Sequence, residues 1–176
     1  MSAAGRSGIR VETRGTGAAR VETGVPVLDH LVEQLALYAR FDLSLEVEPG
    51  AAETEVAEAG SALGRALHDV LRADDATGYG FASMTSAEAL ASVVLEADDD
   101  EPLLVSNVDL TGARVGGLGT DVARRFLERF ADGAGVTLHV RLLNGTDSQH
   151  VLEAIFKALG VALAAACRPE GGGSGR

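Results

Sequence analysis

The chain repeats itself, and this internal duplication restricts its fold more than any other feature of the sequence. Three pairs of segments match in the same order: residues 43–47 with 136–140, residues 62–67 (Ala-Leu-Gly-Arg-Ala-Leu) with 158–163 (Ala-Leu-Gly-Val-Ala-Leu), and Asp29 with Asp121. The offsets are similar in all three pairs, and the order is conserved. The sequence therefore predicts two copies of one structural unit.

Each copy is expected to run strand, strand, helix, strand, helix, from its hydrophobic periodicity. In the first copy we expect strands at 9–13 and 18–23, a helix at 25–39, a strand at 43–47 and a helix at 54–72. In the second copy we expect strands at 89–97 and 103–110, a helix at 120–131, a strand at 136–142 and a helix at 147–163. Residues 98–102 are acidic and end in proline, which favours a hairpin between the strands on either side.

A small sheet with two helices on one face must bury those helices against something. The two copies therefore pack helix to helix, and the expected architecture is a duplicated α+β fold with four helices between two sheets. We expect residues 1–8 to be a disordered N-terminus, 9–80 the first half, 81–168 the second half and 169–176 a flexible, glycine-rich tail. Residues 73–80 are expected to link the halves.

The composition favours a core of small aliphatic side chains. Hydrophobic residues make up 46% of the chain, aromatic residues only 4%, and tryptophan is absent. Leucine, valine and alanine must therefore fill the interior, and alanine-rich packing predicts helices that approach closely.

Charge and cysteine usage exclude several classes of function. The net charge of -11 disfavours nucleic-acid binding, which needs lysine and arginine clusters. No run of about 18 apolar residues predicts a membrane span, and residues 1–8 do not resemble a signal peptide. The one cysteine, Cys167, has no internal partner, which is typical of a reducing compartment. We expect a soluble, cytoplasmic protein that binds neither nucleic acid nor membrane.

The segment 147–163 carries candidate site residues at its start. Asp147 or Ser148 can cap its first turn, and Gln149, His150 and Glu153 then share one helix face. A histidine and a glutamate on one face can bind a metal or relay a proton. The alternative interpretation is a solvated polar surface.

Three segments resemble the imidazoleglycerol-phosphate dehydratase family, a hydro-lyase family of histidine biosynthesis. They are residues 25–36 (Val-Pro-Val-Leu-Asp-His-Leu-Val-Glu-Gln-Leu-Ala), 138–145 (Leu-His-Val-Arg-Leu-Leu-Asn-Gly) and 150–159 (His-Val-Leu-Glu-Ala-Ile-Phe-Lys-Ala-Leu). The resemblance covers residues 9–165 and implies a ribosomal S5 domain 2-like fold. It also implies metal-dependent dehydration of imidazole glycerol phosphate to imidazole acetol phosphate.

The resemblance implies two manganese ions bound between subunits of a symmetric oligomer, in which they act as Lewis acids. The metal-ligand positions that this chain keeps are His30, His139, His150 and Glu153. Of the family's two His-His-x-x-Glu motifs, the second is Gln-His-Val-Leu-Glu at 149–153, and the first is Glu-Thr-Glu-Val-Ala at 53–57. A metal site needs three or four converging ligands. We therefore expect one manganese ion rather than two, or none.

The resemblance also implies a catalytic role for Glu88 and substrate-binding roles for Gln34, Arg114 and Lys157. Several phosphate-binding positions are changed, which include Gly78 and Glu101 in place of arginine. Lys157 is a phosphate anchor on one interpretation and an exposed charge on the other.

The expected function is an imidazoleglycerol-phosphate dehydratase-like protein with an eroded two-metal site. Two alternatives stay open: a non-catalytic pseudo-enzyme that serves as an oligomer subunit, and a diverged enzyme that acts on another imidazole or phosphate compound. On each interpretation we expect a small-molecule ligand and a homo-oligomer.

Overall fold

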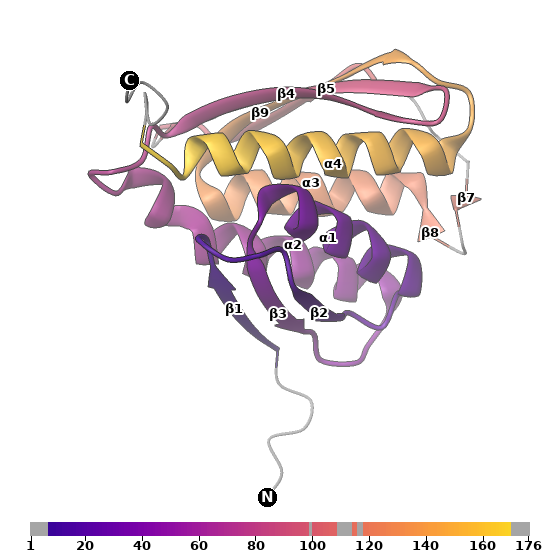
Figure 1. Cartoon of the computed structure of the whole chain (residues 1–176). Coiled ribbons are helices and arrows are strands. Elements are labelled where there is room, and N and C mark those ends of the chain that lie inside the picture. The colour runs from indigo at the N-terminus through magenta and orange to yellow at the C-terminus, as the bar shows by residue number, and fades with distance from the viewer. Residues whose placement is uncertain (1–6, 99, 109–113, 116–117, 170–176) are drawn as a thin grey trace, which may run out of the picture.

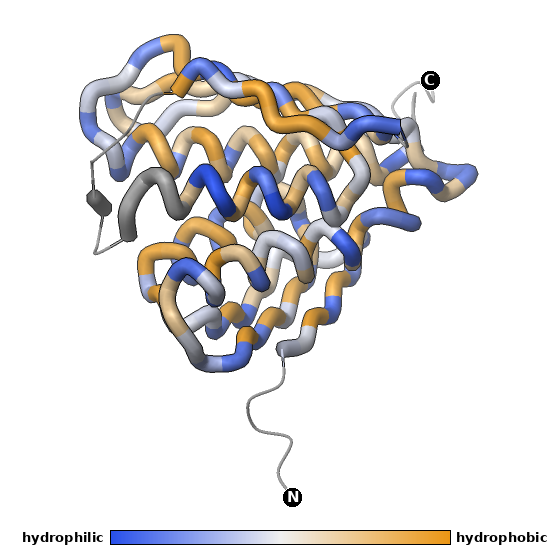
Figure 2. Tube along the Cα trace, turned by 180° about the vertical axis from the view of Figure 1, so that it is seen from behind, coloured by the Kyte–Doolittle hydropathy of each residue, from blue (hydrophilic) through white to orange (hydrophobic). Residues whose placement is uncertain are grey.

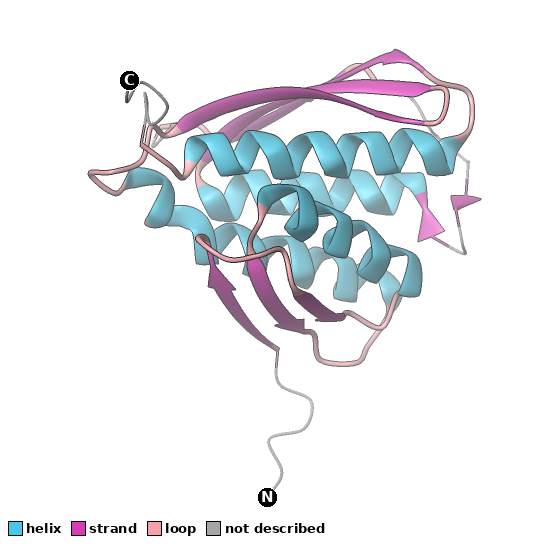
Figure 3. Cartoon of the chain, in the orientation of Figure 1, coloured by secondary structure: helices cyan, strands magenta, loops and turns pink. Residues whose placement is uncertain are grey.

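The computed structural model describes residues 7–98, 100–108, 114–115 and 118–169, and within them four helices lie between two sheets (Figure 1). Figure 3 separates the helix layer from the strands on either side of it. This confirms the expected α+β architecture. The expected disordered start and flexible tail lie outside the described residues, except for residues 7, 8 and 169.

The first sheet contains β1 (Gly8–Glu12), β2 (Ala19–Glu22) and β3 (Asp42–Glu46). Its order is β1-β3-β2, with β1 antiparallel and β2 parallel to the central strand. The expected strands are therefore present, but the glycine-rich turn between β1 and β2 does not pair them. Helices α1 (Pro26–Ala39) and α2 (Ala52–His68) cover one face of this sheet, and a 3-10 turn at Val70–Arg72 follows α2.

The second sheet repeats this pairing pattern. Its order is β4-β5-β9-β6, with β4 (Tyr79–Ser86) at one edge. Strand β5 (Ala89–Ala97) is antiparallel and β6 (Leu103–Ser106) is parallel to β9 (Val136–Asn144). The expected hairpin between residues 89–97 and 103–110 is therefore wrong, because β9 lies between β5 and β6. The inner side chains of Val136, Leu138 and Val140 in β9 are buried, which is typical of a central strand.

Helices α3 (Thr120–Ala134) and α4 (Ser148–Ala166) belong to this second half, and two short strands, β7 (Arg114–Val115) and β8 (Leu118–Gly119), precede α3. In Figure 2 the colour along the helices changes repeatedly between hydrophilic and hydrophobic residues, as expected for amphipathic helices.

Strand β4 (Tyr79–Ser86) was not predicted; it pairs antiparallel with β5 at the sheet edge. Its inner face carries Gly80 and Ala82, so the hydrophobic alternation that signals a strand is weak. Gly80 packs on the carbonyl of Ala162 in α4, where a Cβ atom would collide with backbone. The small residues that conceal this strand from sequence analysis are therefore the ones that let it approach α4.

Glycines bring the helices into close contact in two pairs. A Cβ atom on Gly64 of α2 would lie 2.5 Å from the carbonyl oxygen of Phe130 in α3. A Cβ atom on Gly160 of α4 would collide with the carbonyl oxygen of Leu35 in α1. These two glycines occupy matching positions in the repeated Leu-Gly segments. The expected close approach of the helices is therefore confirmed, and it occurs twice.

Helix α4 is long and apolar enough to span a membrane by length and composition, contrary to the expectation that no segment would pass this test. However, 67% of the tested window is buried inside the protein, against α1 on one side and the second sheet on the other. Its apolar surface is therefore accounted for as core.

Candidate functional site

The N-terminal end of α4 collects most of the polar side chains that the sequence singled out. Asp147 caps the helix: its carboxylate accepts hydrogen bonds from the backbone amides of Gln149 at 2.9 Å and His150 at 3.1 Å. His30 approaches from α1, and Ser86 and Glu88 approach from the β4–β5 turn. We call these residues the α4 cluster: His30, Ser86, Glu88, Gln149, His150 and Glu153.

Glu88 ties the β4–β5 turn to α4. The turn has two residues, because Ser86 pairs with Ala89, and Ala87 adopts a positive φ of 51°. Glu88 Oε2 accepts hydrogen bonds from the backbone amides of Asp147 at 2.8 Å and Thr146 at 3.0 Å. Its other oxygen, Oε1, lies 2.6 Å from Nδ1 of His150. The imidazole is therefore held in one orientation, and Nε2 is left for other contacts.

These contacts shift the pKa values of Glu88 and His150. The backbone amides of Asp147 and Thr146, together with His150, lower the pKa of Glu88 to about 2. The hydrogen bond to Glu88 raises the pKa of His150 above its ordinary value of 6.5. The contact therefore favours the carboxylate form of Glu88 and the imidazolium form of His150. With so low a pKa, Glu88 is a weak proton acceptor, so the geometry favours a role in orienting His150, and its catalytic role stays a prediction.

Glu88 should make stability depend on pH in the acid range. Its pKa is about 2 when folded and near the ordinary 4.5 when unfolded, so its contribution is present above 4.5 and is lost as pH falls through 2. The raised pKa of His150 acts in the opposite sense: its contribution is present below 6.5 and is lost as pH rises through the folded pKa. We expect Glu88→Gln to flatten the loss of unfolding free energy between pH 5 and 2, measured by urea denaturation.

Glu53→Gln is the control for that experiment, because Glu53 is exposed and makes no hydrogen bond or ion pair to any described residue. Its stability should follow the wild-type pH dependence. If the unfolding free energies of wild type and Glu88→Gln fell equally between pH 5 and 2, the lowered pKa of Glu88 would be contradicted.

Glu153 is the second carboxylate of the α4 cluster, and its side chain is 17% exposed. Oε1 accepts the Ser86 hydroxyl at 2.7 Å, and Oε2 accepts the Gln149 amide at 3.3 Å and lies 3.4 Å from Nε2 of His30. Burial tends to raise the pKa of Glu153, but the contacts with Ser86, Gln149 and His30 outweigh it, and the net pKa is lowered. Ser86 was missed from the sequence because the strand that holds it, β4, was not predicted.

The predicted substrate-binding residues lie partly beside this cluster. Lys157 follows Glu153 by one helical turn; its Nζ donates to the carbonyl of Thr85 at 3.3 Å and lies 5.3 Å from the centroid of the Tyr38 ring. Gln34 follows His30 by one turn of α1 and is half-buried. The side chain of Arg114 lies outside the described residues. The substrate-binding roles of all three stay predictions.

His139 is not part of the α4 cluster. It lies exposed on the outer face of the second sheet, opposite the helices, with Val94 and Val105 in register on the flanking strands. Among the residues that the structure describes, no group of three or more His, Cys, Asp and Glu side chains is arranged to hold a metal ion. No buried side-chain nitrogen or oxygen there lacks a hydrogen-bond partner. Of the four predicted ligands, His30, His150 and Glu153 therefore lie together in the α4 cluster, whereas His139 lies apart from them within one chain.

Helix α2 is the counterpart of α4 in the first half of the repeat, and its start carries even fewer candidate ligands. Glu53 and Thr54 are exposed, and Ala57 has no donor atom. Glu55 faces inward, is 7% exposed, and accepts a hydrogen bond from the backbone amide of Gly50 at 3.2 Å. The two halves are thus alike in fold and unlike in chemistry.

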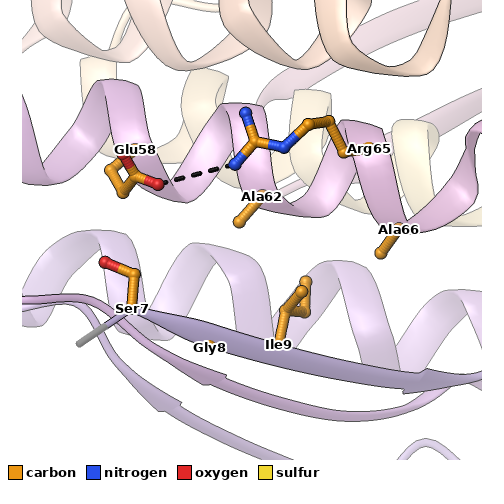
Figure 4. Close-up of a pocket in the computed structure, with 7 residues that line it drawn as sticks. All are labelled: Ser7, Gly8, Ile9, Glu58, Ala62, Arg65 and Ala66. Atoms are coloured by element: carbon orange, nitrogen blue, oxygen red, sulfur yellow. Dashed lines mark ion pairs between the residues drawn. The ribbon is translucent and has the colours of Figure 1, made fainter.

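A hollow between β1 and α2 is separate from the α4 cluster (Figure 4). It is lined by Ser7, Gly8, Ile9, Glu58, Ala62, Arg65 and Ala66, with an ion pair of 3.6 Å between Glu58 and Arg65. Its floor is alanine and backbone, and the lining brings no histidine. Its one carboxylate, Glu58, is paired with Arg65, so we do not assign the site to this hollow.

Comparison with known proteins gives one consistent result. The family model for imidazoleglycerol-phosphate dehydratase matches residues 23–163. The chain is 41% identical over 160 residues to the imidazoleglycerol-phosphate dehydratase of Syntrophobacter fumaroxidans, which covers 88% of this chain and 80% of that protein. It is 39% identical over 164 residues to the enzyme of that name from an Azoarcus species, which covers 90% and 83%.

Solved structures agree with these matches. The imidazoleglycerol-phosphate dehydratase of Staphylococcus aureus superimposes with a TM-score of 0.84 at 26% identity, over 93% of this chain and 94% of that chain. The Pyrococcus furiosus protein gives a TM-score of 0.81 at 27% identity, over 94% and 91%.

Proposed function

Because the chain belongs to the imidazoleglycerol-phosphate dehydratase family, we propose that it is a dehydratase of this type whose metal complement is reduced from two ions to at most one. One observation carries the proposal. The α4 cluster groups two histidines and two glutamates, whereas the matching start of α2 offers only the exposed carboxylate of Glu53.

The α4 cluster suits proton transfer. Dehydration removes a proton from one carbon and a hydroxyl group from its neighbour, and the two leave as water. We propose that His150, whose protonated form is favoured by Glu88, gives a proton to the leaving hydroxyl, and that His30 accepts the carbon proton. A manganese ion, where bound, would supply Lewis-acid stabilisation of the imidazole ring of the substrate.

The direct test is to incubate the purified chain with imidazole glycerol phosphate, with and without manganese, and to measure imidazole acetol phosphate by mass spectrometry. Metal content is measured on the same sample. Product formation with at most one ion per chain is the expected result. Two ions per chain would contradict the proposed loss of a metal ion. Absence of product would contradict the proposed dehydratase activity.

We also propose a homo-oligomer, and the outer face of the second sheet supports it. Phe81, Val94, His139 and Val105 form one row across all four strands, and Phe81 is 74% exposed. Tyr79 and Leu103 add further exposed apolar surface. An apolar sheet face of this kind marks an interaction site. We propose a second copy as the occupant of this face, which would bring His139 to the interface between the two chains.

We expect Phe81→Ser to dissociate the assembly into smaller species, because it removes the most exposed aromatic ring of that face. Light scattering after size exclusion measures the change. Leu37→Ser is the matched control, since Leu37 is an exposed apolar residue, 50% exposed, on α1. A wild-type chain that runs as a monodisperse monomer would contradict the proposal.

A non-catalytic subunit is the second candidate, favoured by the missing ligand donors at the start of α2. It predicts no turnover alone and activity or assembly only with a complete paralogue, whereas a diverged enzyme would turn over another imidazole or phosphate compound. The lone cysteine, Cys167, is buried and unpaired, which suits a cytoplasmic location for any of these.

A further inference from the structure

The carboxylate of Glu153 receives three polar contacts from three different elements. Ser86 at the end of β4 donates to Oε1 at 2.7 Å, Gln149 in the first turn of α4 donates to Oε2 at 3.3 Å, and His30 of α1 lies 3.4 Å from Oε2. A carboxylate has about four lone-pair sites. Both oxygens of Glu153 are therefore engaged by groups of the chain itself.

Hydrogen-bond donors and metal ions satisfy a carboxylate in the same way, by placing positive charge on its lone pairs. An imidazole at position 149 would offer a lone pair toward a cation, whereas the Gln149 amide offers N–H groups toward Glu153. We infer that Ser86, Gln149 and His30 take the place of a metal ion on Glu153, so that the α4 cluster is complete without a cation. This rests on the proposed function and sharpens it from at most one ion to none at this cluster.

The surroundings of Ser86 support the inference. Ser86 is 9% exposed, and Glu153 Oε1 is the acceptor for its hydroxyl. Drawing Glu153 toward a metal ion would leave that buried hydroxyl without its acceptor, which is unfavourable. Gln149 is exposed, so changes there leave the core packing intact.

The test compares wild type, Gln149→His and Gln149→Ala as full-length purified chains. Melting temperature is recorded with EDTA and with saturating manganese, and bound manganese is counted after dialysis. We expect wild type and Gln149→Ala to hold no manganese and to melt at the same temperature in both conditions. We expect Gln149→His to bind manganese and to melt several degrees higher with it, because the change adds an imidazole one turn from Glu153 and removes the amide contact to Oε2.

Ser86→Ala gives a metal-independent readout. Loss of one buried hydrogen bond should lower the melting temperature by about 2–4 °C, equally in EDTA and manganese. One manganese ion per wild-type chain would overturn the inference and leave the proposed function standing, while two ions per chain would overturn both. A Gln149→His variant that responds to manganese no more than Gln149→Ala would overturn the role given to Gln149.

Discussion

Gly160→Val should destabilise the protein by about 3 kcal/mol, the upper end of the usual range for overpacking. Helix propensity alone predicts the opposite sign, because valine is a better helix former than glycine. The collision decides the outcome: a Cβ atom at this position meets the carbonyl oxygen of Leu35 and lies 3.2 Å from the backbone nitrogen of Ala39. Backbone atoms cannot rotate aside as a side chain does, so α1 and α4 must separate. Urea denaturation measures the loss.

Gly50→Val is the matched control, because a Cβ atom at Gly50 meets nothing within 4 Å. Its effect should stay within about 0.5 kcal/mol. If Gly160→Val does not fold, Gly160→Ala provides a graded measure of the same contact. Equal stabilities for Gly160→Val and Gly50→Val would show that the two helices do not meet at this glycine.

His150→Gln should lower kcat for dehydration by about 10²-fold or more, with a smaller change in KM. A positioned general acid contributes on the order of 10²–10⁴ to a rate, and glutamine cannot donate in the same way. His150 is oriented through its Nδ1 by Glu88 and keeps Nε2 for a substrate. The readout is formation of imidazole acetol phosphate under steady-state conditions.

In the same assay, Glu88→Gln tests whether Glu88 acts by orienting His150 and raising its pKa. If protonated His150 is the acid, activity falls as pH rises through the raised pKa of His150. Removing the carboxylate removes the cause of the raised pKa, so this fall should move to lower pH. His68→Gln is the control, since His68 pairs with its neighbour Asp69 at 2.9 Å, away from α4. Full activity in His150→Gln would contradict the assignment.

Local patterns in the sequence were enough to predict the helices and the duplication of the fold. The amphipathic period predicted all four helices. The start of α4 agrees to within one residue because Asp147 supplies a side-chain cap, whereas its end lies three residues beyond the predicted one. The repeated Leu-Gly segments predicted two equivalent halves, and the structure gives both glycines the same packing role. Each of these signals depends on neighbours three or four positions apart, which share a helix face wherever the helix is placed.

Long-range pairing was harder to predict. The hairpin expected across residues 98–102 was wrong because β9, which comes later in the chain, inserts between β5 and β6. Strand β4 was missed because glycine and alanine on its inner face do not produce a hydrophobic alternation. The family resemblance named His30, His139, His150 and Glu153 together, yet His139 lies on the outer face of the second sheet and the other three lie around α4.

The sequence by itself determined the helices, the duplication and the family, because burial of one face leaves a regular period in the chain. Only the tertiary structure decided which polar groups meet: Ser86 and His30 on Glu153, and Glu88 on His150. Those contacts join residues more than 60 positions apart. Their geometry depends on how β4, α1 and α4 pack, and no local pattern encodes that packing.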